Sequence, residues 1–243
     1  MKKYVLLATI AGLVTFTSCT SHSQSSLRDR LGSAGSSSTN SGPVTQSEAT
    51  RGLKEALRIG AEHATKNLSS TDGYFRNQAI KILLPKEAQV VESTLRSVGM
   101  GDLVDETILK MNRAAEDAAI KARPIFISAI TGMSIQDGLQ ILRGGEDAAT
   151  KYLQRSTTTK LANEFRPVIQ GSLSKVGADR IWATVFDNYN RMPLVRNKIN
   201  PDLVGYVTEK ALEGLFYSIA QEEMKIRANP GAQASKILRR VFG

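Results

Sequence analysis

The feature that most constrains the fold of this chain is a series of apolar residues spaced three and four positions apart. Between positions 104 and 125 the series comprises Val104, Ile108, Met111, Ala115, Ala118, Ala122 and Ile125. An α-helix has 3.6 residues per turn, so this spacing places every member on one face. It predicts a long amphipathic helix that Pro124 bends or ends near its carboxyl-terminal end. The alanines in the middle let a neighbouring helix approach closely.

Helical spacing continues through most of the chain from Thr45 onward. Thr45 and Glu48 match a capping box at a helix start, and an apolar face follows them at Ala49, Leu53, Ala56, Gly60, Ala64 and Leu68. Residues 70–73 ("STDG") predict a turn. Residues 79–85 ("AIKILLP") are the one stretch compatible with a short strand, which Pro85 would stop.

Further helices are expected at 86–97, 134–142, 146–155, 157–175, 178–190, 201–228 and 232–242. We therefore predict an all-α fold, a single helical domain of roughly eight or nine helices. It would occupy residues 48–243, after a signal peptide and a flexible linker.

The amino terminus has the pattern of an export signal. Lys2 and Lys3 precede an apolar run over 4–14, and small and polar residues follow before Cys19, the only cysteine of the chain. Positive, apolar and small-residue segments in that order are typical of a secretory signal, here residues 1–18. The apolar run is shorter than the roughly 20 residues that span a bilayer.

Cys19 could be a free thiol, half of an intermolecular disulfide or the lipid-bearing first residue of a mature lipoprotein. The stretch Phe16-Thr17-Ser18-Cys19 resembles the lipobox of bacterial lipoproteins, although Phe16 replaces the usual leucine. We interpret Cys19 as a lipid attachment site, because one cysteine after an apolar run and before a spacer suits an anchor. Acyl chains on this residue would hold the protein to a membrane.

The segment after the cysteine predicts a flexible tether. Residues 19–47 are dominated by Ser, Gly, Thr and Asn, with too few apolar residues to pack. A flexible chain of this length spans roughly 30 Å. These features predict a location on the periplasmic side of the cell envelope, and Thr20 after the cysteine favours the outer membrane.

The folded part has few residues for familiar catalytic designs. The chain contains two histidines, of which His22 lies in the predicted linker and His63 in the first helix. A Cys/His zinc site or a histidine-assisted nucleophile therefore cannot be assembled. No P-loop or glycine fingerprint occurs either. We predict no catalytic residue, no metal site and no cofactor, and we expect His63 to lie at the surface.

Several polar residues lie beside the alanine face of the helix predicted near 104–125, and we call them the candidate polar cluster. Its members are Asn112, Arg113, Glu116 and Asp117. Arg113, Asp117 and Lys121 have i, i+4 spacing, which predicts either a solvated ion-pair face or the lining of a cavity. Asn112 and Glu116 could instead form a half-buried pair that fixes helix packing.

Other polar residues have structural explanations. Glu146 and Asp147 precede a predicted helix, where carboxylates favour the positive end of the helix dipole. Glu223 and Arg227 have the i, i+4 spacing of an ion pair.

Trp182, Phe186 and Tyr189 form an aromatic stripe along another predicted helix. We interpret the stripe as core, the alternative being the wall of an apolar ligand pocket.

The chain is basic, with a formal net charge of +9. Residues 151–200 carry nine Lys or Arg against three acidic residues, and residues 224–243 carry five against none. The export signal argues against a nucleic-acid partner. The anionic partners expected at a periplasmic membrane are phospholipid headgroups, lipopolysaccharide and peptidoglycan. The predicted terminal helix 232–242 would dock on the domain or lie on a membrane surface.

Several short sequence motifs occur in this chain in the same order as in a known family. They are "GLKEAL", "LLP", "MNRAAEDA", "PIF", "GGEDAAT", "ALEGLF", "EEMKIR" and "VFG". The chain resembles, over about residues 48–243, a bacterial family known as domain of unknown function 4197. The resemblance implies an exported, mainly helical domain and supplies no catalytic residues.

Two functions follow from these observations. The first is a non-enzymatic, lipid-anchored domain that binds a partner or an apolar ligand at the cell envelope. The second is a hydrolase or lyase that acts on an envelope polymer such as peptidoglycan through a carboxylate, with Glu116 as the acid. A glutamate beside an open cleft would favour the second, and closed packing around Ala115 and Ala118 the first.

Overall fold

The first helix begins at the capping box that the sequence predicts. The Thr45 hydroxyl accepts a hydrogen bond from the Glu48 amide (3.2 Å), and the Glu48 carboxylate accepts one from the Thr45 amide (3.1 Å). The computed structural model describes residues 43–191 and 198–229, all within one compact unit that starts at Pro43. The predicted signal peptide, Cys19, most of the linker and the predicted helix 232–242 lie outside the described residues.

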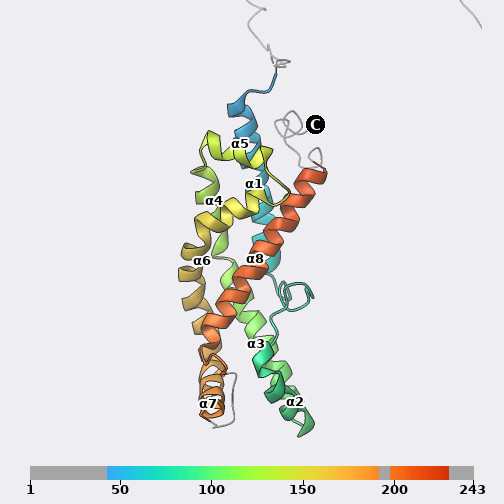
Figure 1. Ribbon diagram of the computed structural model, residues 1–243, viewed down its shortest axis with the longest axis vertical. Helices are drawn as coiled ribbons and strands as arrows, with labels where there is room; N and C mark the ends of the chain where they lie inside the picture. The colour runs from blue at the N-terminus through green and yellow to red at the C-terminus, as the bar shows by residue number, and fades with distance from the viewer. Residues whose placement is uncertain (1–42, 192–197, 230–243) are drawn as a thin grey trace, which may run out of the picture. The chain divides into compact units, whose positions relative to one another are not determined.

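The regular structure of the described residues is entirely helical (Figure 1). The elements are α1 (Gln46–Leu68), the 3-10 helix η1 (Lys86–Ala88), α2 (Gln89–Ser97), α3 (Gly101–Ala119), α4 (Ala122–Thr131), α5 (Ile135–Arg143), α6 (Ala148–Lys175), α7 (Ala178–Asn190) and α8 (Leu203–Ala228). The predicted all-α class and single helical domain are confirmed.

Two predicted boundaries were wrong. The helix expected across 104–125 is broken at residues 120–121, so Pro124 lies in the first turn of α4, where its missing amide proton costs nothing. The helices expected at 146–155 and 157–175 are one helix, α6. Its polar residues at the expected break are helical, and their hydroxyls are bonded within the helix: Thr157 Oγ1 donates to the Leu153 carbonyl (2.6 Å) and Ser156 Oγ to the Tyr152 carbonyl (2.8 Å).

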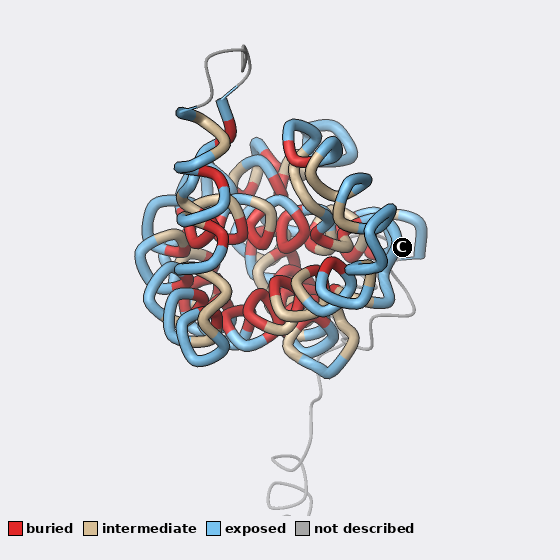
Figure 2. The backbone as a smooth tube through the Cα atoms, turned by 90° about the horizontal axis from the view of Figure 1, so that it is seen from below, coloured by how far each residue is buried: buried red, intermediate tan, exposed pale blue. Residues whose placement is uncertain are grey.

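The alanine face of α3 lies at the centre of the domain. Ala114, Ala115, Ala118 and Ala119 are all at most 1 % exposed. Their small side chains allow α3 to pack closely against both α6 and α8. Figure 2 shows the buried residues turned inward and the exposed ones outward around the bundle.

Close approach also governs the contacts of α8. A Cβ added at Gly60 in α1 would lie 3.3 Å from Glu222 Cβ and from Ile226 Cδ1, so glycine sets the spacing of α1 and α8. A Cβ at Gly214 would lie 2.7 Å from the Tyr74 ring. Tyr74 can therefore insert fully against α8, and its hydroxyl donates to the Ala211 carbonyl at 2.7 Å. Burial raises the pKa of the Tyr74 phenol well above its ordinary value.

Within residues 43–191 and 198–229, no single helix is both long and apolar enough for a membrane span. Only α4 and α5 taken together satisfy that test, and the chain bends by 103° between them.

Candidate functional site

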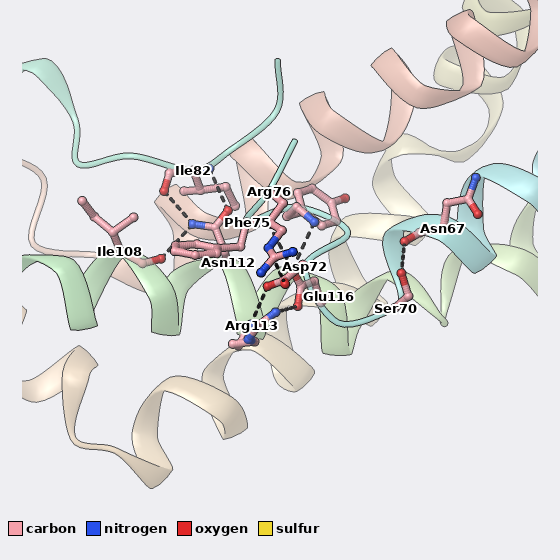
Figure 3. A network of polar contacts seen from close by, with 11 residues as sticks. Asn67, Ser70, Asp72, Phe75, Arg76, Ile82, Ile108, Asn112, Arg113 and Glu116 are labelled. Carbon is pink, nitrogen blue, oxygen red and sulfur yellow. Dashed lines mark hydrogen bonds and ion pairs between the residues drawn. The ribbon is translucent and has the colours of Figure 1, made fainter. Parts of the chain in front are cut away.

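The segment between α1 and η1, residues 69–85, has no helix or strand and lies against α3 and α8. Such a segment must find hydrogen-bond partners for its backbone outside a helix or sheet, because an unpaired buried amide is costly. The predicted turn at 70–73 is present, whereas the possible strand at 79–85 is not. Side chains of the candidate polar cluster supply the partners instead (Figure 3).

Glu116 holds the first part of this segment. One carboxylate oxygen, Oε1, accepts from the amides of Tyr74 (3.0 Å) and Phe75 (3.1 Å). The other, Oε2, accepts from Arg113 Nη1 at 2.6 Å. Glu116 is 4 % exposed, so the carboxylate is buried and bonded at both oxygens.

Arg113 links that carboxylate to a second one on the segment. Its Nη2 donates to Asp72 Oδ1 at 2.7 Å, and Asp72 Oδ2 forms an ion pair with Arg76, whose Nε lies 2.9 Å away. The hydrogen bond with Glu116 and then the one with Asp72 raise the pKa of Arg113. Asp72 has a φ of 69°, a left-handed conformation that is unfavourable for a residue with a side chain. The two ion pairs offset that cost.

Asn112 holds the end of the segment in the manner of a neighbouring strand. Its Oδ1 accepts from the Ile82 amide (2.9 Å), and its Nδ2 donates to the Ile82 carbonyl (2.8 Å). Nδ2 also donates to the Ile108 carbonyl, one turn earlier in α3, at 2.7 Å. One side-chain amide thus replaces the strand pairing that the sequence of 79–85 suggested.

The structure divides the candidate polar cluster into two parts. Asn112, Arg113 and Glu116 face the segment 69–85, whereas Asp117 is exposed and accepts from Ser172 Oγ of α6 at 2.8 Å. The predicted pairs of Asp117 with Arg113 and Lys121 were wrong. Arg113 turns instead to Glu116, three residues later on its own helix, and to Asp72, which the segment 69–85 brings to it from a position remote in sequence.

A second buried carboxylate, Glu223 of α8, caps the start of α6. It accepts from the amides of Ala149 (3.0 Å) and Thr150 (2.8 Å) and from Thr150 Oγ1 (2.8 Å). Arg227 pairs with it at 2.9 Å, as the spacing predicted. The first amides of a helix have no partner within the helix, and Glu223 rather than Glu146 or Asp147 binds two of them here.

An apolar opening lies between α2, the start of α3 and α7, and we call it the apolar cleft. Its volume is about 450 Å³. Its apolar lining includes Val91, Leu95, Met100, Leu103, Ile181 and Val185. Its polar lining includes Glu92, Glu106 and Thr107. Glu92 pairs with Arg96 at 3.0 Å, and Glu106 lies 3.9 Å from Lys110.

A second opening adjoins the apolar cleft, and we call it the polar cavity. It has a volume of about 1040 Å³ and lies between residues 79–89, residues 198–200 and the first half of α8. Tyr206 lines it and donates from its hydroxyl to the Leu83 carbonyl at 2.8 Å. Burial raises the pKa of Tyr206 to about 12.

Trp182 lines both openings, as does Leu84. Within the aromatic stripe, Trp182 and Phe186 are buried with ring centroids 4.3 Å apart, and Tyr189 packs edge-on against Phe186. The stripe is thus core on one side and cavity wall on the other. The spacing of the aromatic side chains can be read from the sequence, but the sequence does not show which parts of the molecule these side chains face.

His63 is exposed, and its Nδ1 lies 3.7 Å from a carboxylate oxygen of Glu222. Among the described residues, no group of three His, Cys, Asp or Glu side chains is arranged to hold a metal ion.

Comparison with protein families places the folded part of the chain in a family. Residues 43–243 match the model of a family described as "Protein of unknown function (DUF4197)". Neither the curated proteins nor the solved structures give a match.

Proposed function

The chain belongs to the DUF4197 family of proteins of unknown function, and we propose that it is a non-enzymatic binding protein of the cell envelope. Lipid on Cys19 anchors it to the membrane, on the periplasmic side. The apolar cleft between α2, α3 and α7 holds the hydrocarbon part of a ligand.

The apolar cleft carries this proposal. Five large apolar side chains that line it are exposed by 41 % to 56 %, namely Met100, Leu103, Val176, Ile181 and Val185. Single exposed apolar residues are common, but a group on facing helices is typical of an interaction site. The cleft volume falls within the roughly 300–1,000 Å³ of small-molecule sites. Covering apolar surface stabilises by about 25 cal/mol per Å², so an apolar ligand would be favoured there.

The position of the cleft suits a tethered protein. The middle of α1 packs against the end of α8, around Gly60 and Ile226, whereas the start of α8 lies beside the openings at Gly205 and Tyr206. The 26 residues of α8 extend over about 39 Å at 1.5 Å per residue. The chain therefore enters the domain far from the cleft, as Figure 1 shows with α1 and α2 at opposite ends.

The structure favours binding over a carboxylate reaction at Glu116. Glu116 lines neither the apolar cleft nor the polar cavity, and both its oxygens accept hydrogen bonds from the protein. Ala115 and Ala118 beside it are fully buried. The carboxylate holds the segment 69–85 in place, which accounts for its burial and its contacts.

The anchor is tested by Cys19→Ala in the intact gene product. We expect the protein to move from the membrane fraction to the soluble periplasmic fraction, because the thiol that would carry the acyl chains is lost. Immunoblots of washed membranes and of periplasmic extract measure the change. A serine-to-alanine change at Ser21 is the matched control, and membrane association that survives Cys19→Ala would refute the anchor.

The cleft is tested with Trp182, the only tryptophan of the chain. Bromine quenches tryptophan fluorescence on contact, so 9,10-dibromostearate should quench Trp182 saturably. Val185→Asp should weaken this binding by about tenfold or more, because a carboxylate would be desolvated in the cleft. Val90→Asp is the matched control, since Val90 is 65 % exposed and lines neither opening. Equal quenching in both variants would contradict the assignment.

A further inference from the structure

The polar cavity and the apolar cleft adjoin each other at Trp182 and Leu84, which line both. A ligand with its hydrocarbon chain in the apolar cleft would therefore place a polar group at the other end into the polar cavity. The side chains of that cavity indicate which polar group fits.

The polar cavity holds charges of both signs that have no ion-pair partner among the described residues. Lys86 and Lys198 are its exposed cations without a carboxylate within 4.0 Å, and Glu87 and Glu209 are the corresponding anions. The other charged side chains are engaged, because Lys210 pairs with Glu213 at 2.7 Å and Lys81 lies 4.1 Å above the Phe75 ring.

We infer, on the basis of the proposed function, that the ligand is a glycerophospholipid whose headgroup combines a phosphate with a primary ammonium. The phosphate lies toward Lys86 and Lys198, because lysine ammonium groups bind phosphate as point charges. The ammonium lies toward Glu87 and Glu209 and donates hydrogen bonds to their carboxylates. The acyl chain lies in the apolar cleft against Trp182.

The mixture of charges selects this headgroup over its relatives. A purely anionic headgroup would satisfy the lysines but would meet Glu87 and Glu209 with like charge. A trimethylammonium headgroup carries the right charges, yet it has no N–H to donate to the carboxylates. Phosphoethanolamine satisfies both requirements, and it is the occupant to which we commit.

Binding of three lysophospholipids with one dibromostearoyl chain and different headgroups tests the inference. The full chain with Cys19→Ala is titrated, below micelle-forming concentrations and without detergent, while Trp182 quenching is recorded. We expect phosphoethanolamine to bind about fivefold more tightly than phosphoglycerol or phosphocholine, the factor that corresponds to a partly exposed ion pair.

Two substitutions should separate the charges. Lys198→Ala should weaken both the phosphoethanolamine and the phosphoglycerol lipid, because both carry the phosphate. Glu209→Gln should weaken the phosphoethanolamine lipid and strengthen the phosphoglycerol lipid, because it removes a partner from one and a like charge from the other. Lys66→Ala is the control, since Lys66 is exposed on α1 and lines neither opening.

The outcomes are distinct. Preference for phosphoethanolamine with opposite responses to Glu209→Gln supports the inference. Saturable quenching that is equal for the three headgroups overturns it and leaves the apolar cleft as the binding site. Absence of saturable quenching with dibromostearate and with every lysophospholipid overturns the proposed function itself.

Discussion

Replacing Glu116 by alanine should lower the free energy of unfolding by about 3 kcal/mol, because it leaves a buried and a half-buried amide without an acceptor and removes one partner of a partly exposed arginine. The change strips the Tyr74 and Phe75 amides of their shared acceptor and leaves Arg113 with Asp72 alone. Natural domains are stable by only about 5–15 kcal/mol, so the loss is a large part of the total. Urea unfolding followed by circular dichroism measures it.

Glu116→Gln tests which part of the contact matters. Glutamine keeps an oxygen that can accept from the two amides but turns an NH₂ group toward Arg113 Nη1, which is also a donor. We therefore expect a loss about half as large as that of Glu116→Ala. Hydrogen exchange of the Tyr74 and Phe75 amides should accelerate in the alanine variant before global unfolding.

Glu55→Gln is the matched control for Glu116. Glu55 pairs with Arg58 at 2.9 Å, but both side chains are more than a third exposed. Exposed pairs contribute about 0–1 kcal/mol, so little change is expected. A Glu116→Ala loss as small as that of Glu55→Gln would show that the segment 69–85 does not depend on this carboxylate. A measurable turnover on peptidoglycan that Glu116→Gln abolishes in a folded protein would overturn the binding proposal.

Glu223→Ala should cost about 3 kcal/mol of stability, because it removes both a helix cap and the partner of a half-buried arginine. The amides of Ala149 and Thr150 lose their acceptor at the start of α6, and Arg227 keeps only its contact with the Ile141 carbonyl. The helix should open first at its amino-terminal end, because Ala149 and Thr150 belong to the first turn of α6. Urea unfolding and hydrogen exchange at Ala149 and Thr150 measure the two effects.

Glu213→Ala is the matched control on the same helix. Glu213 pairs with Lys210 at 2.7 Å, but it is 53 % exposed. Its removal should change stability by less than about 1 kcal/mol. If the two alanine variants were equally stable, the Ala149 and Thr150 amides would have to be satisfied by water, and the capping role of Glu223 would be wrong.

Much of the fold could be predicted because helical periodicity is local. The capping box at Thr45 and the limits of α7 are confirmed, since caps and turns depend on residues a few positions apart. The break between α3 and α4 was harder to place, because Pro124 permits a helix to start just before it as readily as it ends one. The continuity of α6 was missed because Ser and Thr are weak helix formers on their own, whereas α6 packs along α3 and α8, and tertiary packing overrides local propensity.

The polar contacts were less predictable, because their partners are remote in sequence. Arg113 has a carboxylate at i+4 in Asp117, but it pairs with Glu116 and with Asp72, which lies 41 positions earlier. The spacing of Glu223 predicts only an ion pair with Arg227, whereas its main contacts are amides 73 and 74 positions away. No spacing rule within one helix contains that information.

The all-α class, the family and the buried side of each helix can be predicted from the order of residues alone, because periodic apolar residues specify which side of a helix is buried. The packing of distant segments was needed to see that Asn112 and Glu116 hold an irregular segment and that α2 and α7 face each other across an apolar cleft. The reason is physical: a periodic pattern identifies the buried face of a helix, whereas the group that covers that face depends on how distant segments pack.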